Sequence, residues 1–344
     1  MGDAVCYQIV MGVRRVVGLV LAASACAHAH AAPASPGDEA ARGGSTSVAA
    51  AEPAAVQAPP AREGAPSGEL TAAQARAYMV RLINRDRATM NLPPVTLDEG
   101  PAQRAGQRHA EDMATHGYLG HYGTDGSVPE ERFTDAGGSD MVLENASCFT
   151  DEKKRALDGA PRIDPRNVEQ TEDMFFHEKA PHDGHRKNIL KPMHQKVGIG
   201  VAQPVATPTE IPVPCFSQEF VDDYGTYGAV PAHLRVGETL HVEGTVDAPA
   251  TFAGVGLARL EMPRPIAVSE LNKRRSYPVP TPFQMYWPPG FQTPIPVRVA
   301  GARFSIDVPV TDAGKPGLYE LSVWATVPGS TDLAMVSLRT ISVR

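Results

Sequence analysis

The chain has 344 residues, of which 42% are hydrophobic and 21% are charged, and its formal net charge is −7 at pH 7. This length suggests roughly two domains of ordinary size. The mild acidity excludes nucleic acid as the main partner, because proteins that bind nucleic acid need a basic surface, and no apolar stretch is long enough to remain in a membrane as a helix.

The N-terminus, residues 1–31, has the pattern of an export signal. Arg14 and Arg15 precede the apolar run VVGLVLAASA, and small residues follow it. Two ways of processing stay open. Cleavage after Ala31 would release a secreted chain, whereas the sequence ASAC is similar to a lipoprotein box and would leave Cys26 as a lipid-bearing first residue. We therefore expect an exported protein, extracellular or in the cell envelope, with membrane contact only through a lipid at Cys26.

The next segment, residues 32–67, consists mainly of alanine, proline, glycine and glutamate. It has almost no large apolar side chain, so it cannot bury enough surface to offset the entropy lost on ordering. We expect it to be a disordered tether.

Two amphipathic helices are predicted after the tether. Thr71 and Gln74 have the spacing of a capping box for the first helix. Its buried stripe is expected to be Ala75, Met79, Leu82, Ile83 and Asp86. The second helix is expected to run from Pro101, which suits a first turn, to Gly117, which suits a C-cap. Small residues dominate its stripe, so we expect it to lie close against a neighbour, with His109 as a core side chain bonded to the backbone.

A third helix is predicted between Asp164, which can cap it, and Lys179. Its stripe is Val168, Thr171, Phe175 and Glu178. Glu178 would therefore point towards the core, where a carboxylate needs hydrogen-bond donors, a metal or a proton. Proline at position 181 is expected to stop the helix before the polar stretch PHDGHRKNIL.

Short strands and then a second domain follow the helices. The segments VGIGVAQPV and CFSQEFV are strand-like, so residues 68–226 indicate an α+β domain. Residues 227–344 alternate apolar and polar side chains in LHVEGTV, FSIDVPV, LYELSVWATV and MVSLRTISVR, which predicts an antiparallel β-sandwich. The stretch TDAGKPGLYELSV resembles the tyrosine corner of immunoglobulin-like sandwiches.

Aromatic residues gather between Arg274 and Pro294, in RRSYPVPTPFQMYWPPGFQTP. Its prolines keep this stretch from pairing as a central strand. Two interpretations stay open: the aromatic side chains pack over an open end of the sandwich, or they form a surface for a ligand or partner.

The segments from residue 75 to 220 resemble the CAP superfamily, also called SCP-like, in its bacterial secreted form. The similar segments are LINRDRATMNLPPVTLDEG, AGQRHAEDMATHGYLGH, ERFTDAGGSDMVLENAS and GHRKNILKPMHQKVGIGVA, in that order. The resemblance implies a three-layer α-β-α sandwich, here followed by an all-β immunoglobulin-like sandwich. The family's tryptophan is represented by Phe175, and Leu143 stands where the family has glycine.

The resemblance also implies a cleft lined by two histidines and two acidic residues. Carried over by motif, they are His121 from GYLGH, Glu144 from LEN, Glu178 from FFHE and His185 from GHRKNIL. Two imidazoles and two carboxylates suit a divalent metal, and zinc is the natural candidate, with His121 and His185 as ligands. The alternative is that both carboxylates only hydrogen-bond the histidines or loop amides and pin the long loops onto the helices.

These residues favour a binding protein over an enzyme. The sequence has no G-x-S-x-G elbow, no phosphate loop and no dinucleotide fingerprint. The alternative function is a metal-dependent, peptidase-like hydrolase of the cell envelope, in which one acid acts on a metal-bound water. The family suggests binding of sterols or other lipids as a further alternative. The sandwich is expected to bind an unidentified surface, protein or small molecule.

Only Cys148 and Cys215 are expected to remain as thiols after export, because Cys6 is removed with the signal and Cys26 is either removed or acylated. Two thiols in an oxidising compartment favour one disulfide, and the alternative is two buried free thiols. Asn145, Arg186 and Asn188 are expected to have structural roles, bonding loop carbonyls and the helix end. Three further histidines are expected to be exposed in loops: His116, His182 and His194.

Overall fold

The computed structural model describes residues 64, 66–205, 207, 212–274 and 276–344. The predicted export signal, Cys26 and the tether up to residue 63 lie outside the described residues. Among the described residues, no helix has the length and apolar character needed to cross a membrane.

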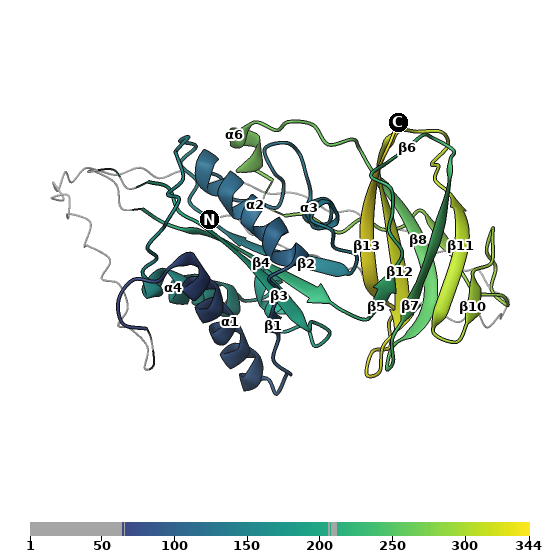
Figure 1. The fold of residues 1–344 in the computed structure, drawn as a ribbon, viewed down its shortest axis with the longest axis horizontal. Helices are drawn as coiled ribbons and strands as arrows, with labels where there is room; N and C mark the ends of the chain where they lie inside the picture. The colour runs from purple at the N-terminus through teal and green to yellow at the C-terminus, as the bar shows by residue number, and fades with distance from the viewer. Residues whose placement is uncertain (1–63, 65, 206, 208–211, 275) are drawn as a thin grey trace, which may run out of the picture. The chain divides into compact units, whose positions relative to one another are not determined.

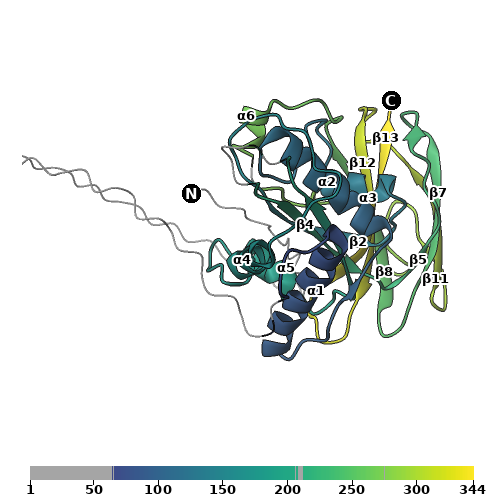
Figure 2. The same ribbon diagram turned by 60° about the vertical axis from the view of Figure 1, so that its left-hand side comes forward.

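The N-terminal part contains five helices and a four-stranded sheet among its described residues. The helices are α1 (Ala72–Thr89), α2 (Pro101–His116), α3 (Pro129–Asp135), α4 (Pro165–Phe176) and α5 (Gly184–Ile189). The strands, in sheet order, are β1 (Thr96–Leu97), β3 (Lys196–Ala202), β4 (Cys215–Asp222) and β2 (Met141–Ser147). Helix α2 covers one face of the sheet, and α1 and α4 cover the other (Figures 1 and 2). This arrangement confirms the predicted three-layer α-β-α fold.

Local capping signals explain where the helices begin and end. The Thr71–Gln74 capping box is present, Gly117 is the left-handed C-cap of α2, and the Asp164 side chain accepts a hydrogen bond from the Arg166 amide. The prediction for Glu178 was wrong in one respect. Helix α4 ends at Phe176, so Glu178 lies in the following loop, because Pro181 has no amide hydrogen to donate to the His177 carbonyl and its ring would clash with that carbonyl in a helix.

Helix α2 lies directly on strand β3, as its small residues predict. A methyl group built at Gly200 would lie 2.1 Å from the carbonyl oxygen of Gly106, and one at Gly106 would lie 3.3 Å from the amide nitrogen of Gly200. Because backbone meets backbone here, no side chain can move to make room. This contact fixes the height of α2 above the sheet, and α2 carries His109 towards the site described below.

The C-terminal part is a β-sandwich of two sheets. One sheet has the order β10 (Arg298–Ala300), β11 (Arg303–Pro309), β7 (Thr239–Val246) and β5 (Gly225–Tyr227). The other has the order β6 (His233–Leu234), β13 (Ala334–Val343), β12 (Gly317–Thr326), β8 (Thr251–Leu260) and β9 (Gln284–Tyr286). The four alternating segments fall in β7, β11, β12 and β13. The tyrosine corner is present, since the Tyr319 hydroxyl donates to the Lys315 carbonyl at 2.7 Å.

The aromatic stretch between residues 274 and 294 divides between burial and exposure. Tyr277 and Tyr286 are both 4% exposed, and a methyl group at Gly254 would strike the Trp287 ring at 2.8 Å. Phe291, in contrast, is 69% exposed. Packing therefore accounts for the two tyrosines and Trp287, but not for Phe291.

Candidate functional site

The first half of the site is a buried pair on the α2 face of the sheet. His121 lies in the loop after α2, and Glu144 lies in β2. Their side chains are 3% and 2% exposed, and His121 Nδ1 lies 2.9 Å from Glu144 Oε1. His109, fully buried on α2, has Nε2 at 3.6 Å from the same oxygen and at 2.8 Å from the Gly120 carbonyl.

Arg132 of α3 completes this half. Its Nη2 donates to Glu144 Oε2 at 2.7 Å and to the His121 carbonyl at 3.0 Å, and its Nη1 donates to the Ser127 carbonyl at 2.9 Å. Burial alone would raise the pKa of Glu144. The opposing effect of His109, Arg132 and His121 is larger and holds that pKa below its ordinary value. Glu144 is therefore an ionised carboxylate that fixes His121.

The second half is a pair in the loop between α4 and α5. His185 Nδ1 lies 2.5 Å from Glu178 Oε1, and the His185 amide donates to Glu178 Oε2 at 2.9 Å. Phe175 supports the imidazole from α4, with ring centroids 4.4 Å apart. Both oxygens of Glu178 thus accept hydrogen bonds from His185, and the carboxylate orients the ring.

Strand β2 joins the two pairs. The Asn145 side chain donates to the His185 carbonyl at 3.2 Å, and Asn188 of α5 donates to Asn145 Oδ1 at 2.9 Å and to the Glu144 carbonyl at 3.3 Å. Glu144 itself belongs to the first pair, and its neighbour Asn145 bonds the backbone of His185 in the second pair. We call His121, Glu144, Glu178 and His185 the His–Glu site.

Arg186 anchors the α5 end of this loop. Its Nη1 donates to the Phe176 carbonyl, and its guanidinium carbon lies 4.4 Å from the centroid of the Phe176 ring. The side chain therefore ties α5 to the last residue of α4 and does not point at either imidazole.

His121 and His185 are better suited than Glu144 and Glu178 to act as metal ligands. In each pair Nδ1 is engaged by a carboxylate, which leaves Nε2 as the ring nitrogen that can bind a ligand. This carboxylate–histidine arrangement is the usual support for metal-binding histidines. Within the described ranges, no three or more His, Cys, Asp or Glu side chains are grouped to hold a metal ion. The expectation that an acid would be a third ligand therefore finds no support in the geometry.

Sequence reasoning missed a second carboxyl beside Glu144. Glu219 of β4 is the register partner of Glu144 and is fully buried, and it accepts a hydrogen bond from Ser217 Oγ at 2.8 Å. Burial, and then the charge of Glu144, raise the pKa of Glu219 well above its ordinary value. Glu219 is therefore a neutral acid beside an ionised one. An acidic residue inside the strand-like run CFSQEFV was the available signal.

A second missed group lies behind His185. Gln218 of β4 accepts from Asn145 at 2.9 Å and donates to Glu172 of α4 at 2.6 Å. Glu172 is fully buried. The chain of side chains Glu172–Gln218–Asn145 therefore reaches the His185 carbonyl from the core.

Glu172→Gln is expected to make stability less dependent on pH. Burial raises the pKa of Glu172 from 4.5 to about 8, although the hydrogen bond from Gln218 opposes this shift. Between these values the folded state holds a proton that the unfolded state has lost, so stability falls as pH rises. From pH 6 to pH 7 the loss is about 1.4 kcal/mol per proton.

Urea unfolding of the full chain at both pH values measures this difference. Glu172→Gln should flatten the slope, and the exposed control Glu270→Gln should not. An unchanged slope in Glu172→Gln would contradict the assignment of a neutral Glu172.

The prediction of an exposed His194 was wrong. Its side chain is 1% exposed, stacks on Phe220 with centroids 5.0 Å apart, and has Nδ1 at 2.7 Å from Asp222 Oδ1. The partner that holds it is 28 residues away, beyond the reach of local sequence patterns. The predicted disulfide is confirmed, since Cys148 and Cys215 are bonded.

Comparisons with known proteins agree with the fold. Residues 80–206 match the model of the family described as CAP, the cysteine-rich secretory protein family. A search of curated proteins and a search of solved structures found no match.

Proposed function

Because residues 80–206 of this chain form a CAP domain, we propose that the protein is an exported binding protein whose ligand site is the His–Glu site. Nε2 of His121 and Nε2 of His185 would hold a divalent metal, with zinc as the first candidate because it accepts imidazole nitrogen. Such a metal would supply an electrophilic centre for a ligand carboxylate, carbonyl or water. Glu144 and Glu178 would orient the imidazoles.

One observation carries the preference for binding over hydrolysis: both carboxylates are already committed. Glu144 accepts from His121 and Arg132, and Glu178 accepts twice from His185. The hydrolase alternative, in which one acid acts on a metal-bound water, would need a carboxylate of this site that is free to take a proton from that water. Neither carboxylate of the His–Glu site is free in this way.

The location of the protein belongs to the same proposal. The N-terminal pattern of residues 1–31 supports export, as a secreted chain or as one anchored by a lipid at Cys26. The β-sandwich would direct the CAP domain to a surface or partner. Its exposed Phe291 is the first candidate contact.

Zinc titration of the full chain by calorimetry tests the proposed site. We expect saturable uptake of about one zinc per chain. His121→Ala and His185→Ala should each weaken affinity more than about tenfold, and Glu178→Gln should weaken it about 10–100-fold, as for other carboxylates that support metal-bound histidines.

The exposed loop variant His182→Ala is the matched control and should bind like the original chain. If zinc uptake is the same in the original chain and in all the site variants, His121 and His185 are not the ligands. Hydrolysis of a peptide library that stops with a chelator would favour the hydrolase alternative.

A further inference from the structure

One segment of the sandwich part packs on the loop that carries His121. Residues 262–283, which we call the strap, connect β8 to β9 and contain the short helix α6 (Val268–Leu271). The structure describes all of its residues except residue 275. Leu271 is 1% exposed and belongs to the same apolar cluster as Met113 and Tyr118 of the CAP domain. The strap is therefore part of the CAP core, although it follows the first strands of the sandwich in the chain.

Backbone contacts bring the strap to the residues just before His121. The Leu119 amide donates to Asn272 Oδ1 at 3.1 Å. A methyl group built at Gly120 would lie 3.1 Å from the Arg274 carbonyl oxygen and 3.5 Å from that of Leu271. The His109 ring bonds the Gly120 carbonyl from the other side. The peptide that leads into His121 is thus held between α2 and the strap.

A buried cluster also fixes the strap. The Tyr277 hydroxyl donates to Glu130 of α3 and lies 3.4 Å from Glu320 Oε1 of β12. The three side chains are 4%, 2% and 0% exposed, respectively. Tyr122, which directly follows His121, packs edge-on against Tyr277 with ring centroids 5.3 Å apart. We call Tyr277, Glu130 and Glu320 the latch.

The latch is held by hydrogen bonds between its side chains rather than by an ion pair. The register partners of Glu320 are Ala258 and Thr340, which carry no charge. Burial, and then the carboxyl of Glu130, raise the pKa of Glu320 well above its ordinary value. A neutral Glu320 can share its proton with the neighbouring carboxyl, which explains how two buried acids lie side by side.

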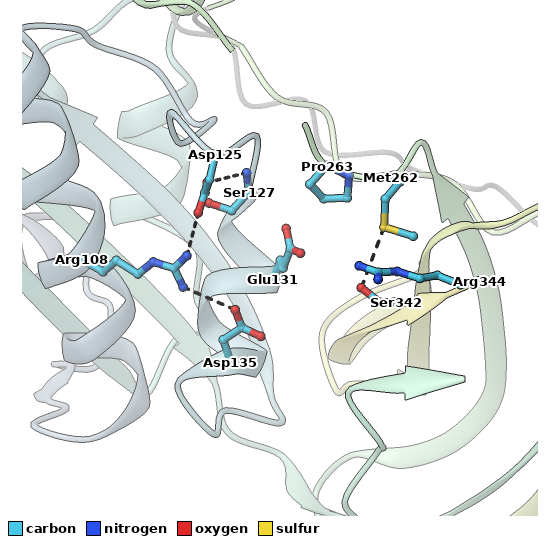
Figure 3. Close-up of a pocket in the computed structure, with 9 residues that line it drawn as sticks. All are labelled: Arg108, Asp125, Ser127, Glu131, Asp135, Met262, Pro263, Ser342 and Arg344. Carbon is cyan, nitrogen blue, oxygen red and sulfur yellow. Dashed lines mark hydrogen bonds and ion pairs between the residues drawn. The ribbon is translucent and has the colours of Figure 1, made fainter. Parts of the chain in front are cut away.

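The first residues of the strap also contact the CAP domain. The Ile266 amide donates to the Thr124 carbonyl at 2.9 Å, and a methyl group built at Gly126 would lie 2.3 Å from the Arg264 carbonyl oxygen. Met262 and Pro263 line a pocket of about 220 Å³, together with Glu131 of α3 and Arg344. Figure 3 shows the Glu131 carboxylate facing this space, without a bond to the other side chains drawn. The strap is therefore held at residues 264–266 as well as at α6 and at the latch.

We propose that the strap positions His121, so that the β-sandwich controls the His–Glu site through Asn272 and the latch. This inference rests on the proposed function only for the ligand that His121 would bind. Asn272 and Tyr277 are positioning residues, because they touch the neighbours of His121 and not His121 itself.

Two variants of the full chain, Tyr277→Phe and Asn272→Ala, test these two contacts of the strap separately. The matched control is Tyr286→Phe, which removes the hydroxyl of another buried tyrosine in the same part of the chain. Hydrogen exchange of the amides of residues 118–122 should speed up about tenfold or more in both strap variants and not in the control. The proton signals of the His121 ring in NMR spectra should shift in the same two variants.

Zinc affinity, measured on the same proteins, separates this inference from the proposed function. Weaker zinc binding in both strap variants would support the role of the strap and also the proposed metal site. Faster exchange at residues 118–122 in a chain that never binds zinc would support the strap and reject the metal site. Equal exchange in the strap variants and in Tyr286→Phe would overturn the inference.

Discussion

Replacing Arg132 with methionine is expected to lower the free energy of unfolding by about 3–5 kcal/mol at pH 7. The guanidinium is 2% exposed and bonds Glu144, the His121 carbonyl and the Ser127 carbonyl. Methionine fills similar volume but leaves the ionised Glu144 buried without the guanidinium that bonds its Oε2. The loss should appear in urea unfolding followed by circular dichroism.

Arg108→Met is the matched control for this change. Arg108 also pairs with carboxylates, those of Asp125 and Asp135, but its side chain is 49% exposed. Exposed pairs contribute about 0–1 kcal/mol, so the control should change stability little. Equal losses in the two variants would mean that Glu144 does not depend on Arg132.

The pair of Arg132 and Glu144 also predicts how the stability of the protein changes in acid. The pKa of Glu144 is lower in the folded state than its ordinary value. Its contribution is therefore fully present above that ordinary value and is lost as pH falls through the lower, folded-state pKa. Arg132→Met should reduce this part of the acid sensitivity.

Gly200→Ala is expected to destabilise the fold by at least about 3 kcal/mol, at the upper end of the range for overpacking. The added methyl group would lie 2.1 Å from the Gly106 carbonyl oxygen, so α2 would have to move away from β3. That movement would also displace His109 and the start of the loop to His121. Thermal unfolding and the yield of folded protein both report the effect.

Gly159→Ala serves as the control because a methyl group there would meet no atom within 4 Å. Its stability should stay the same or rise slightly, since alanine restricts the unfolded chain. A Gly200→Ala protein as stable as this control would show that α2 can lie farther from the sheet than the structure indicates.

Local sequence signals predicted the elements that depend on neighbours in the chain. The capping residue Thr71 and the C-cap Gly117 each act within a few positions, and the structure confirms them. Strand β8 was missed because Gly254 and Gly256 lie where alternation would need larger side chains. Residues at positions 282–287 cover those glycines, and no local pattern records such a distant partner.

The site divides in the same way. Motif resemblance predicted His121, Glu144, Glu178 and His185 as cleft residues. The structure places them in two pairs, one at β2 and one between α4 and α5. The resemblance did not identify Arg132 or Glu219. The role of Glu219 arises from the register of β2 with β4, and that of Arg132 from the position of α3. The strap was also unpredictable, since Asn272 meets Leu119 across 153 residues.

The proposed zinc site can be observed directly in a crystal structure of the full chain soaked in zinc, with anomalous data at the zinc edge. We expect one zinc ion within about 2.0–2.1 Å of Nε2 of both His121 and His185, with each Nδ1 still bonded to its glutamate. Zinc bound to only one of these imidazoles, or the two Nε2 atoms too far apart to share an ion, would contradict the proposed site.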